Sequence, residues 1–166
     1  MTNAIREFKG EYAFLSNFHP VPNFTWQGLE FPTVEHAFQA AKCSWNPLGY
    51  LMQVPGVEEI RIAPTPTAAK RLGRAGPMVP NWDAIKLGIM HELLSLKFSP
   101  YRPGRLYERL RDTGNAWLTE GNRWNDTFWG QDIETGRGSN WLGTLLMLVR
   151  SEWILQNVEA QGGVLH

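Results

Sequence analysis

The segment Phe31–Lys42, FPTVEHAFQAAK, carries an acid, an amide and an amine at a spacing that could do chemistry. On an α-helix, where each residue turns by about 100°, Glu35, Gln39 and Lys42 fall within about 60° of one another. The apolar residues of the segment recur beside this polar edge, at the spacing of a buried helical stripe: Val34, Ala37, Phe38 and Ala41. An acid and an amine that border a core can transfer protons to a substrate or bond to it covalently.

Two interpretations of this polar edge are open. The first is a surface ion pair with Gln39 between its two charges, but such pairs act across three or four residues of a helix. Glu35 and Lys42 are seven residues apart, about 10.5 Å along the axis, which favours a second interpretation in which they hold opposite ends of one ligand. His36 lies elsewhere on the helix, and without an HExxH motif it is expected to be a core or part-exposed histidine and not a metal ligand.

A second candidate site lies in the segment 122–143, NRWNDTFWGQDIETGRGSNWLG. It combines Asp126 with the rings of Trp124, Phe128 and Trp129, and Asn140 stands where a long helix should begin. A helix N-terminus offers free N–H groups and a positive dipole end that suit phosphate. The glycines match neither a P-loop nor a GxGxxG motif, so a long surface loop is the alternative interpretation.

Two basic segments could bind an anion. Lys70, Arg71 and Arg74 crowd a short helix ahead of Trp82, where a cation could hold a phosphate and the indole could stack a base. The run RPGRLYERLR, residues 102–111, is the best candidate for contact with a nucleic-acid backbone. Most such runs are solvated faces, and that interpretation stays open for both.

The composition indicates one globular domain. The chain has 166 residues with 16 basic and 16 acidic side chains, so no net charge draws it to nucleic acid or to an anionic membrane. Its only cysteine, Cys43, is expected to be a small half-buried residue. A lone thiol, no apolar run of bilayer length and a polar N-terminus together predict a soluble cytoplasmic protein without membrane contact.

The pattern of residues predicts a helix-rich α+β domain over residues 1–158, with a small sheet weighted toward the N-terminus and a loose tail at 159–166. A hairpin is expected around Gln27–Gly28, and loops are expected over 11–20 and 53–67. Thr33, Thr67 and Asn140 are expected to cap helices. Helices are expected over 34–42, 68–74, 81–98, 104–112 and 141–156, and a strand over 116–120.

Taken together, these segments resemble the NADAR family, which includes the YbiA-like N-glycosidases. The resemblance covers nearly the whole chain and rests on these motifs in order: FLSNF, FPTVEHAFQAAK, LGR, NW, KF, TG, LTE, DTFWG and GSNWLG with a following LM and R. It implies an α+β fold and hydrolysis of N-glycosidic bonds. Some members act on a ribosylaminopyrimidine phosphate of riboflavin synthesis, others on ADP-ribose attached to guanine in nucleic acid.

By position, the resemblance implies Glu35, Lys42 and Asp126 as catalytic residues, with no cofactor and no metal. It implies these residues at the substrate: Ser16, Asn17, His36, Gln39, Gly73, Arg74, Trp82, Trp129, Gly130, Asn140 and Gly143. We expect ADP-ribosylated guanine, as nucleotide or DNA, to be the substrate, with transient nucleic-acid contact and a paired ADP-ribosyltransferase toxin as partners. The Pro-rich segment 47–66 matches no family motif and is a candidate for shaping substrate choice.

The chemistry that these residues could perform leaves three hypotheses open. An uncharged Lys42 could add to the anomeric carbon and form a Schiff base that water hydrolyses, with Glu35 as proton shuttle. Alternatively, Glu35 or Asp126 could activate water directly while Lys42 holds a phosphate or hydroxyl group. A noncatalytic ADP-ribose-binding module is the third hypothesis, although a module that only binds has no use for an acid and an amine placed together.

Overall fold

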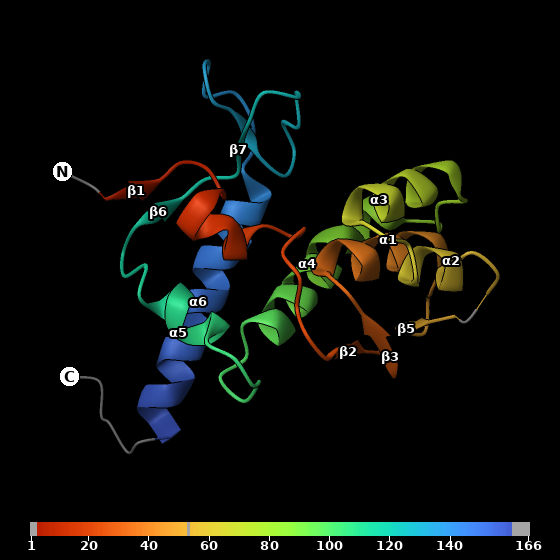
Figure 1. Ribbon diagram of the computed structural model, residues 1–166, viewed down its shortest axis with the longest axis horizontal. Coiled ribbons are helices and arrows are strands. Elements are labelled where there is room, and N and C mark those ends of the chain that lie inside the picture. The colour runs from red at the N-terminus through yellow and green to blue at the C-terminus, as the bar shows by residue number, and fades with distance from the viewer. Residues whose placement is uncertain (1–2, 53, 161–166) are drawn as a thin grey trace. The chain divides into compact units, whose positions relative to one another are not determined.

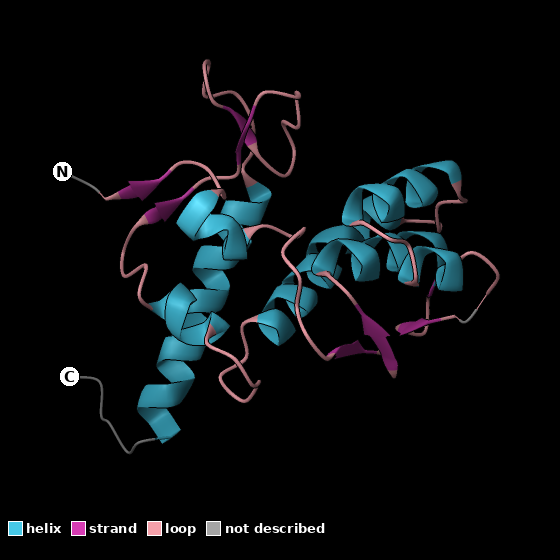
Figure 2. Ribbon diagram, in the orientation of Figure 1, coloured by secondary structure: helices cyan, strands magenta, loops and turns pink. Residues whose placement is uncertain are grey.

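The computed structural model describes residues 3–52 and 54–160. The chain divides into two compact units, which we call the central unit (residues 17–97) and the terminal unit (residues 1–16 and 98–166). Both units contain helices and short strands (Figures 1 and 2). The α+β class is therefore confirmed. The prediction of one small sheet weighted toward the N-terminus needs correction in its detail. Within the described residues the strands form four separate two-stranded sheets, and β6 to β8 lie beyond residue 116.

The central unit is built around helix α1. Its elements are β2 (Phe24–Trp26), β3 (Leu29–Phe31), α1 (Val34–Ser44), β4 (Trp45–Asn46), β5 (Tyr50–Leu51), α2 (Val57–Arg61), α3 (Pro66–Ala75) and α4 (Trp82–Lys97). Helices α2, α3 and α4 all pack against α1 (Figure 1). As a result, nine of the eleven residues of α1 are buried, including the polar Glu35, His36 and Gln39.

The hairpin and the start of α1 form for local reasons. Gln27 and Gly28 have φ values of 52° and 77°, as a tight two-residue hairpin turn requires, and β2 pairs antiparallel with β3 so that Phe24 faces Phe31. Thr33 then caps α1, since its hydroxyl accepts a hydrogen bond from the backbone N–H of His36 at 3.3 Å. The hairpin and this cap confirm the predictions.

The terminal unit joins both ends of the chain. Its elements are β1 (Ala4–Ile5), the 3₁₀-helix η1 (Gly10–Leu15), α5 (Leu106–Arg111), β6 (Trp117–Leu118), β7 (Gly121–Asn122), β8 (Gln131–Asp132) and α6 (Trp141–Ala160). Strands β1 and β6 pair in parallel, as do β7 and β8. Helix α6 packs on α5 and β6, and Arg150 on α6 donates to Thr113 Oγ1 at 2.7 Å and to the carbonyl oxygen of Ala116 at 3.1 Å.

Several local predictions were wrong. Thr65, not Thr67, caps α3, because Thr65 Oγ1 accepts from the N–H of Ala68 and Pro66 fits the first helical position. The segments expected as loops contain η1 and α2. Helix α6 continues to Ala160, and residues 161–166 of the predicted tail lie outside the described part. No helix within that part is long and apolar enough to cross a bilayer.

Candidate active site

The polar edge of α1 is buried, with its acid and amide bonded to each other. Glu35 is 5% exposed and Gln39 is 6% exposed. The amide Nε2 of Gln39 donates to Glu35 Oε1 at 2.9 Å. A carboxylate is costly to bury unless it is hydrogen-bonded, and this bond both lowers the cost and fixes the orientation of the carboxyl group.

Gly73 on α3 lies directly against this pair. A Cβ atom at position 73 would collide with the side chain of Gln39. Glycine in the middle of a helix is unfavourable by about 1 kcal/mol relative to alanine, so its presence in α3 needs a reason. The close approach of α3 to Gln39 is that reason, and it places Gly73 beside the polar edge of α1.

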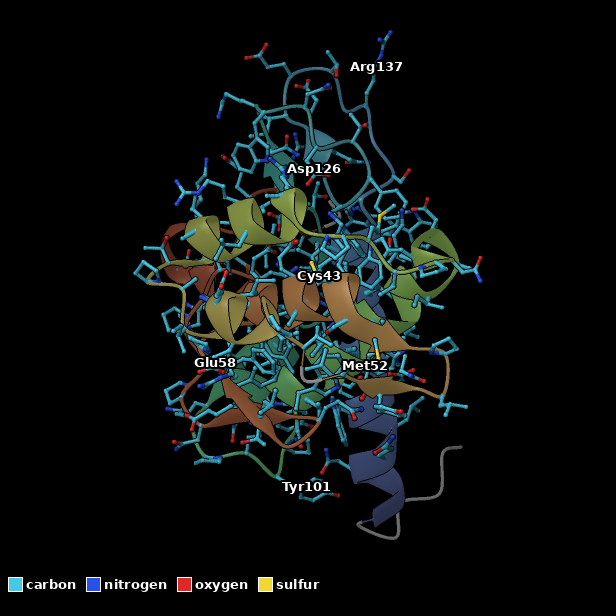
Figure 3. The ribbon with its side chains drawn as sticks, turned by 90° about the vertical axis from the view of Figure 1, so that its right-hand side faces the viewer. Cys43, Met52, Glu58, Tyr101, Asp126 and Arg137 are labelled. Carbon is cyan, nitrogen blue, oxygen red and sulfur yellow. The ribbon has the colours of Figure 1, made fainter. Side chains whose placement is uncertain are left out.

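Lys42 lies one helical turn beyond Gln39 and also contacts Gly73. Its side-chain nitrogen Nζ donates to the carbonyl oxygen of Gly73 at 3.3 Å, and the side chain is half-buried. Cys43, labelled on α1 in Figure 3, lies 3.7 Å from the same carbonyl oxygen, and burial raises the pKa of its thiol. The thiol is therefore a half-buried neutral neighbour of Lys42, as expected of this cysteine.

Asn17 lies beside the first turn of α1. Its backbone carbonyl accepts from the N–H of Glu35 at 3.1 Å, and its Nδ2 contacts Met90 Sδ at 3.4 Å. Asn17 is only 7% exposed, and its Oδ1 is buried without a hydrogen-bond partner in the described structure, as is Gln39 Oε1. Buried acceptors are usually satisfied, so these two oxygens leave acceptor capacity next to Glu35.

His36 is a structural residue, which corrects its assignment as a substrate contact. Its Nε2 lies 3.1 Å from the carbonyl oxygen of Ala63, and its Nδ1 lies 2.8 Å from Thr33 Oγ1. A carbonyl can only accept, so Nε2 carries the proton and Nδ1 accepts from the Thr33 hydroxyl. Burial lowers the pKa of His36, consistent with a neutral ring that has no nitrogen left for a ligand.

Trp82 and Arg74 differ in their availability to a ligand. Trp82 opens α4, is 6% exposed and packs on Phe38 with ring centroids 5.0 Å apart. It is a core residue of the central unit. Arg74 is exposed in the last turn of α3, next to Gly73, and Lys70 and Arg71 precede it on the same helix.

In the terminal unit, Asp126 organises the loop between β7 and β8. Its Oδ1 accepts from the backbone N–H of Trp129 at 2.9 Å. Asn122 holds the backbone of Asp126 from both sides, accepting from its N–H at 3.0 Å and donating to its carbonyl at 2.9 Å. Figure 3 shows Asp126 within this loop. Sequence reasoning did not single out Asn122, a fully buried asparagine at the end of β7, although asparagine side chains often bond to nearby backbone.

Asn140, Gly130 and Gly143 hold the same region together. Asn140 is 2% exposed; its Oδ1 accepts from the N–H of Glu120 at 3.0 Å and its Nδ2 donates to the carbonyl of Leu118 at 2.9 Å. A Cβ at Gly143 would collide with that carbonyl, and one at Gly130 would collide with the carbonyl of Glu120. The side chain of Asn140 therefore connects α6 to β6. It does not cap the helix, contrary to the prediction.

The predicted residues thus fall into two groups, each assembled within one unit. The central unit brings together Asn17, Glu35, Gln39, Lys42 and Gly73. The terminal unit brings together Asp126, Trp129, Gly130, Asn140 and Gly143 around β6 to β8. Ser16 is half-buried at the end of η1, where its N–H donates to the carbonyl of Ala13 at 3.1 Å.

Comparison with known proteins identifies the family of this chain. The model of the NADAR domain matches residues 5–153. This chain belongs to the NADAR family. It is 34% identical to N-glycosidase YbiA of Escherichia coli (strain K12) over 148 aligned positions, which cover 88% of this chain and 84% of that protein. The solved NMR structure of the E. coli protein YbiA matches with a TM-score of 0.76, covering 96% of this chain and 90% of that one.

A second kind of relative carries a different name. The chain is 34% identical over 175 aligned positions to the maize (Zea mays) protein named "Riboflavin biosynthesis protein PYRR, chloroplastic". That alignment covers 98% of this chain but only 27% of the length of the maize protein. The family and the YbiA-like fold are therefore confirmed, and the names of the YbiA relatives support a glycosidase role for this NADAR chain.

Proposed function

We propose that this NADAR chain is an N-glycosidase that cleaves the bond between a ribose anomeric carbon and a base nitrogen, and that it removes ADP-ribose from ADP-ribosylated guanine in nucleic acid. The observation that carries the proposal is the arrangement on α1. A buried Glu35 is oriented by Gln39, and Lys42 follows on the same edge with its nitrogen 3.3 Å from the Gly73 carbonyl. A helix that needed only to pack would have apolar residues at these positions.

Lys42 is the proposed nucleophile. Its uncharged amine adds to the anomeric carbon, the bond from that carbon to the base nitrogen breaks, and the base leaves with a proton. Ring opening gives a Schiff base, which water hydrolyses to free ADP-ribose and the original amine. Glu35 is placed to deliver the proton to the departing nitrogen and to take one from the attacking water. In the rival mechanism Glu35 or Asp126 activates water directly and Lys42 acts as a clamp.

The charge around Gly73 supports a substrate with more than one phosphate. Lys70, Arg71 and Arg74 lie on α3 within three positions of Gly73, whose carbonyl contacts Lys42. ADP-ribose has a pyrophosphate, and a cluster of cations suits such a group better than a single phosphate. A transferase that attaches ADP-ribose to guanine would supply this substrate.

The basic run 102–111 supports nucleic-acid binding less strongly than its sequence suggested. Arg109 donates to the carbonyl of Glu11 at 2.7 Å and lies 4.0 Å over the ring of Phe14. Arg111 pairs with Asp112 at 2.8 Å. Contacts inside the terminal unit thus occupy Arg109 and Arg111. Because Trp82 is buried in the core, Trp129 is the remaining candidate from the original pair for stacking a purine.

A riboflavin-pathway substrate is the second candidate. The maize relative and a Vibrio vulnificus relative, 33% identical over 143 aligned positions, are both named riboflavin biosynthesis proteins. The substrate would be a ribosylaminopyrimidine phosphate, which contains the same kind of carbon–nitrogen bond. It has one phosphate where ADP-ribose has two.

The test is a direct comparison of the two substrates. The protein is incubated with a single-stranded oligonucleotide carrying one ADP-ribosylated guanine and, separately, with the ribosylaminopyrimidine phosphate at equal concentration. We expect mass spectrometry to show free ADP-ribose and restored guanine, at a higher turnover rate than for the pyrimidine. Faster pyrimidine cleavage would reverse the choice of substrate, and binding without release of either product would instead identify a noncatalytic module.

A further inference from the structure

The terminal unit contains a cavity whose lining includes none of the residues assigned to the proposed hydrolysis. Its volume is about 540 Å³, within the range of small-molecule sites. It is lined by the outward face of the β1–β6 pair and by residues at and after β8. In the parallel pairing Ala4 lies opposite Trp117 and Ile5 opposite Leu118. Ile5 and Leu118 are buried, so Ala4 and Trp117 face the other way, into the cavity.

Trp117 is exposed where a strand residue of this size would usually be covered. It is 54% exposed, and within the described residues its indole makes no ring, cation or hydrogen-bond contact with another side chain. Its strand neighbour Ala4 is small, so one face of the ring is not covered by the adjacent strand. An indole beside a cavity is a platform on which a flat, aromatic ligand can stack.

Arg6 gives the same cavity a free cation. It follows β1 on the face that Ala4 shares, is exposed, and forms no ion pair and no side-chain hydrogen bond in the part of the chain that the structure describes. Its guanidinium therefore has all its donors available for a phosphate or another anion.

Acceptors line the cavity on the side of β8. Asp132 Oδ1 takes hydrogen bonds from the hydroxyl and the N–H of Thr135 and from the N–H of Glu134, and these bonds lower the pKa of the carboxyl group, so that it is ionised at neutral pH. Gln131 donates its Nε2 to the carbonyl of Gly138 at 3.1 Å, which leaves its Oε1 as an acceptor. Carboxylate and amide oxygens suit the exocyclic amino groups of nucleobases.

We propose that this cavity binds one nucleotide, with its base stacked on Trp117, its phosphate on Arg6 and a base amino group facing Asp132 and Gln131. The ligand is either a free mononucleotide or one nucleotide of a single strand, since both present the same groups. The acceptors favour guanine, adenine or cytosine over uracil, whose base has no amino group. The proposal does not rest on the hydrolase function, because binding here can hold even where cleavage is absent.

The test measures binding of three probes, 5′-GMP, 5′-UMP and an eight-nucleotide single strand rich in guanine, by isothermal titration calorimetry. Trp117→Leu and Arg6→Gln each remove one contact. Their controls are Tyr101→Leu, since Tyr101 is 81% exposed and does not line the cavity, and Arg137→Gln, since Arg137 is exposed in the same unit and does not line it either. All four positions are exposed, and circular dichroism with a thermal melt checks that each variant folds.

We expect GMP to bind more tightly than UMP, and Trp117→Leu and Arg6→Gln each to weaken binding about tenfold while both controls match the wild type. If GMP shows this pattern, a free nucleotide is the ligand; if only the oligonucleotide shows it, the ligand is a base within a strand. The proposal is overturned if Trp117→Leu and Arg6→Gln bind all probes as the controls do, or if no probe binds at millimolar concentration.

Discussion

At the scale of single residues, the decisive feature is a carboxylate held by an amide inside the protein. Gln39 contacts Glu35 through one hydrogen bond of 2.9 Å and is itself held by the close approach of Gly73. We regard Gln39 as a positioning residue, because it acts on the substrate through Glu35. Its removal should therefore change the rate of the chemical step more than it changes binding.

The first prediction is that Gln39→Met lowers kcat about tenfold or more and changes KM little. Methionine keeps the length of the side chain but cannot donate to Glu35, so the carboxyl group loses its orientation in the proton-transfer step. Steady-state kinetics on the ADP-ribosylated oligonucleotide measure both constants. Gln156→Met, an exposed change on α6, is the control and should leave kcat unchanged. An increase in KM at constant kcat would instead make Gln39 a simple binding residue.

The second prediction concerns His36 and pH. Burial lowers the pKa of His36 in the folded protein, so the unfolded chain binds the proton more readily. The stability that the neutral ring contributes is present above the ordinary pKa of about 6.5 and is lost as pH falls below it. Urea unfolding between pH 7.5 and 5 should show this decline, and His36→Asn should show a smaller one. An equal decline in the free energy of unfolding of the wild type and of His36→Asn would contradict this prediction.

The sequence indicated the residues of α1 well and those of the terminal unit less well. Helical spacing alone put Glu35, Gln39 and Lys42 on one edge, because a helix fixes the direction of each side chain. It could not show that His36 bonds to the carbonyl of Ala63, 27 positions away, or that Asn140 bonds to Leu118 and Glu120. Those partners are set by tertiary packing, which leaves no local pattern.

At the scale of elements, the packing of α3 against α1 gives the third prediction. Gly73→Ala should destabilise the protein by about 1–3 kcal/mol, because the new Cβ collides with Gln39, and it should also lower activity by displacing Glu35. Gly88→Ala is the matched control on α4. Nothing lies within 4 Å of its new Cβ, so this change should stabilise the protein by about 0.5–1 kcal/mol.

Urea unfolding at fixed pH measures the free energy of unfolding of both variants. We expect Gly73→Ala to lower it and Gly88→Ala to raise it. If Gly73→Ala stabilised the protein as Gly88→Ala does, α3 would have room to move away and the close approach to Gln39 would not be a constraint.

Long elements were easier to predict than short ones. The hairpin of β2 and β3, α1, α4 and α6 have turn residues, caps or apolar stripes that span several turns. Strands β4, β5, β7 and β8 have two residues each, too few for any alternation to show, whereas β6 lies within the strand predicted over 116–120. Strand β1 pairs with a partner more than one hundred residues away. Helix α2 has five residues in a Pro-rich segment, and the prolines pointed to a loop.

At the scale of the whole molecule, the sequence predicted one domain, and the family match over residues 5–153 spans both compact units. The composition gives no indication of the two units, since the terminal unit is assembled from both ends of the chain. The central claim is that this NADAR chain is an N-glycosidase that works through Lys42. It requires a covalent bond between the protein and the sugar during turnover.

The most direct test is to trap that bond. Borohydride added while the protein cleaves the ADP-ribosylated oligonucleotide should reduce the Schiff base, and intact-mass spectrometry with peptide mapping should find the sugar adduct on Lys42. Lys42→Arg keeps the charge but has no usable nucleophile, so it should bind substrate, form no adduct and release no ADP-ribose. A Lys42→Arg protein that still releases ADP-ribose would contradict covalent catalysis by this residue and leave water, activated by Glu35 or Asp126, as the nucleophile.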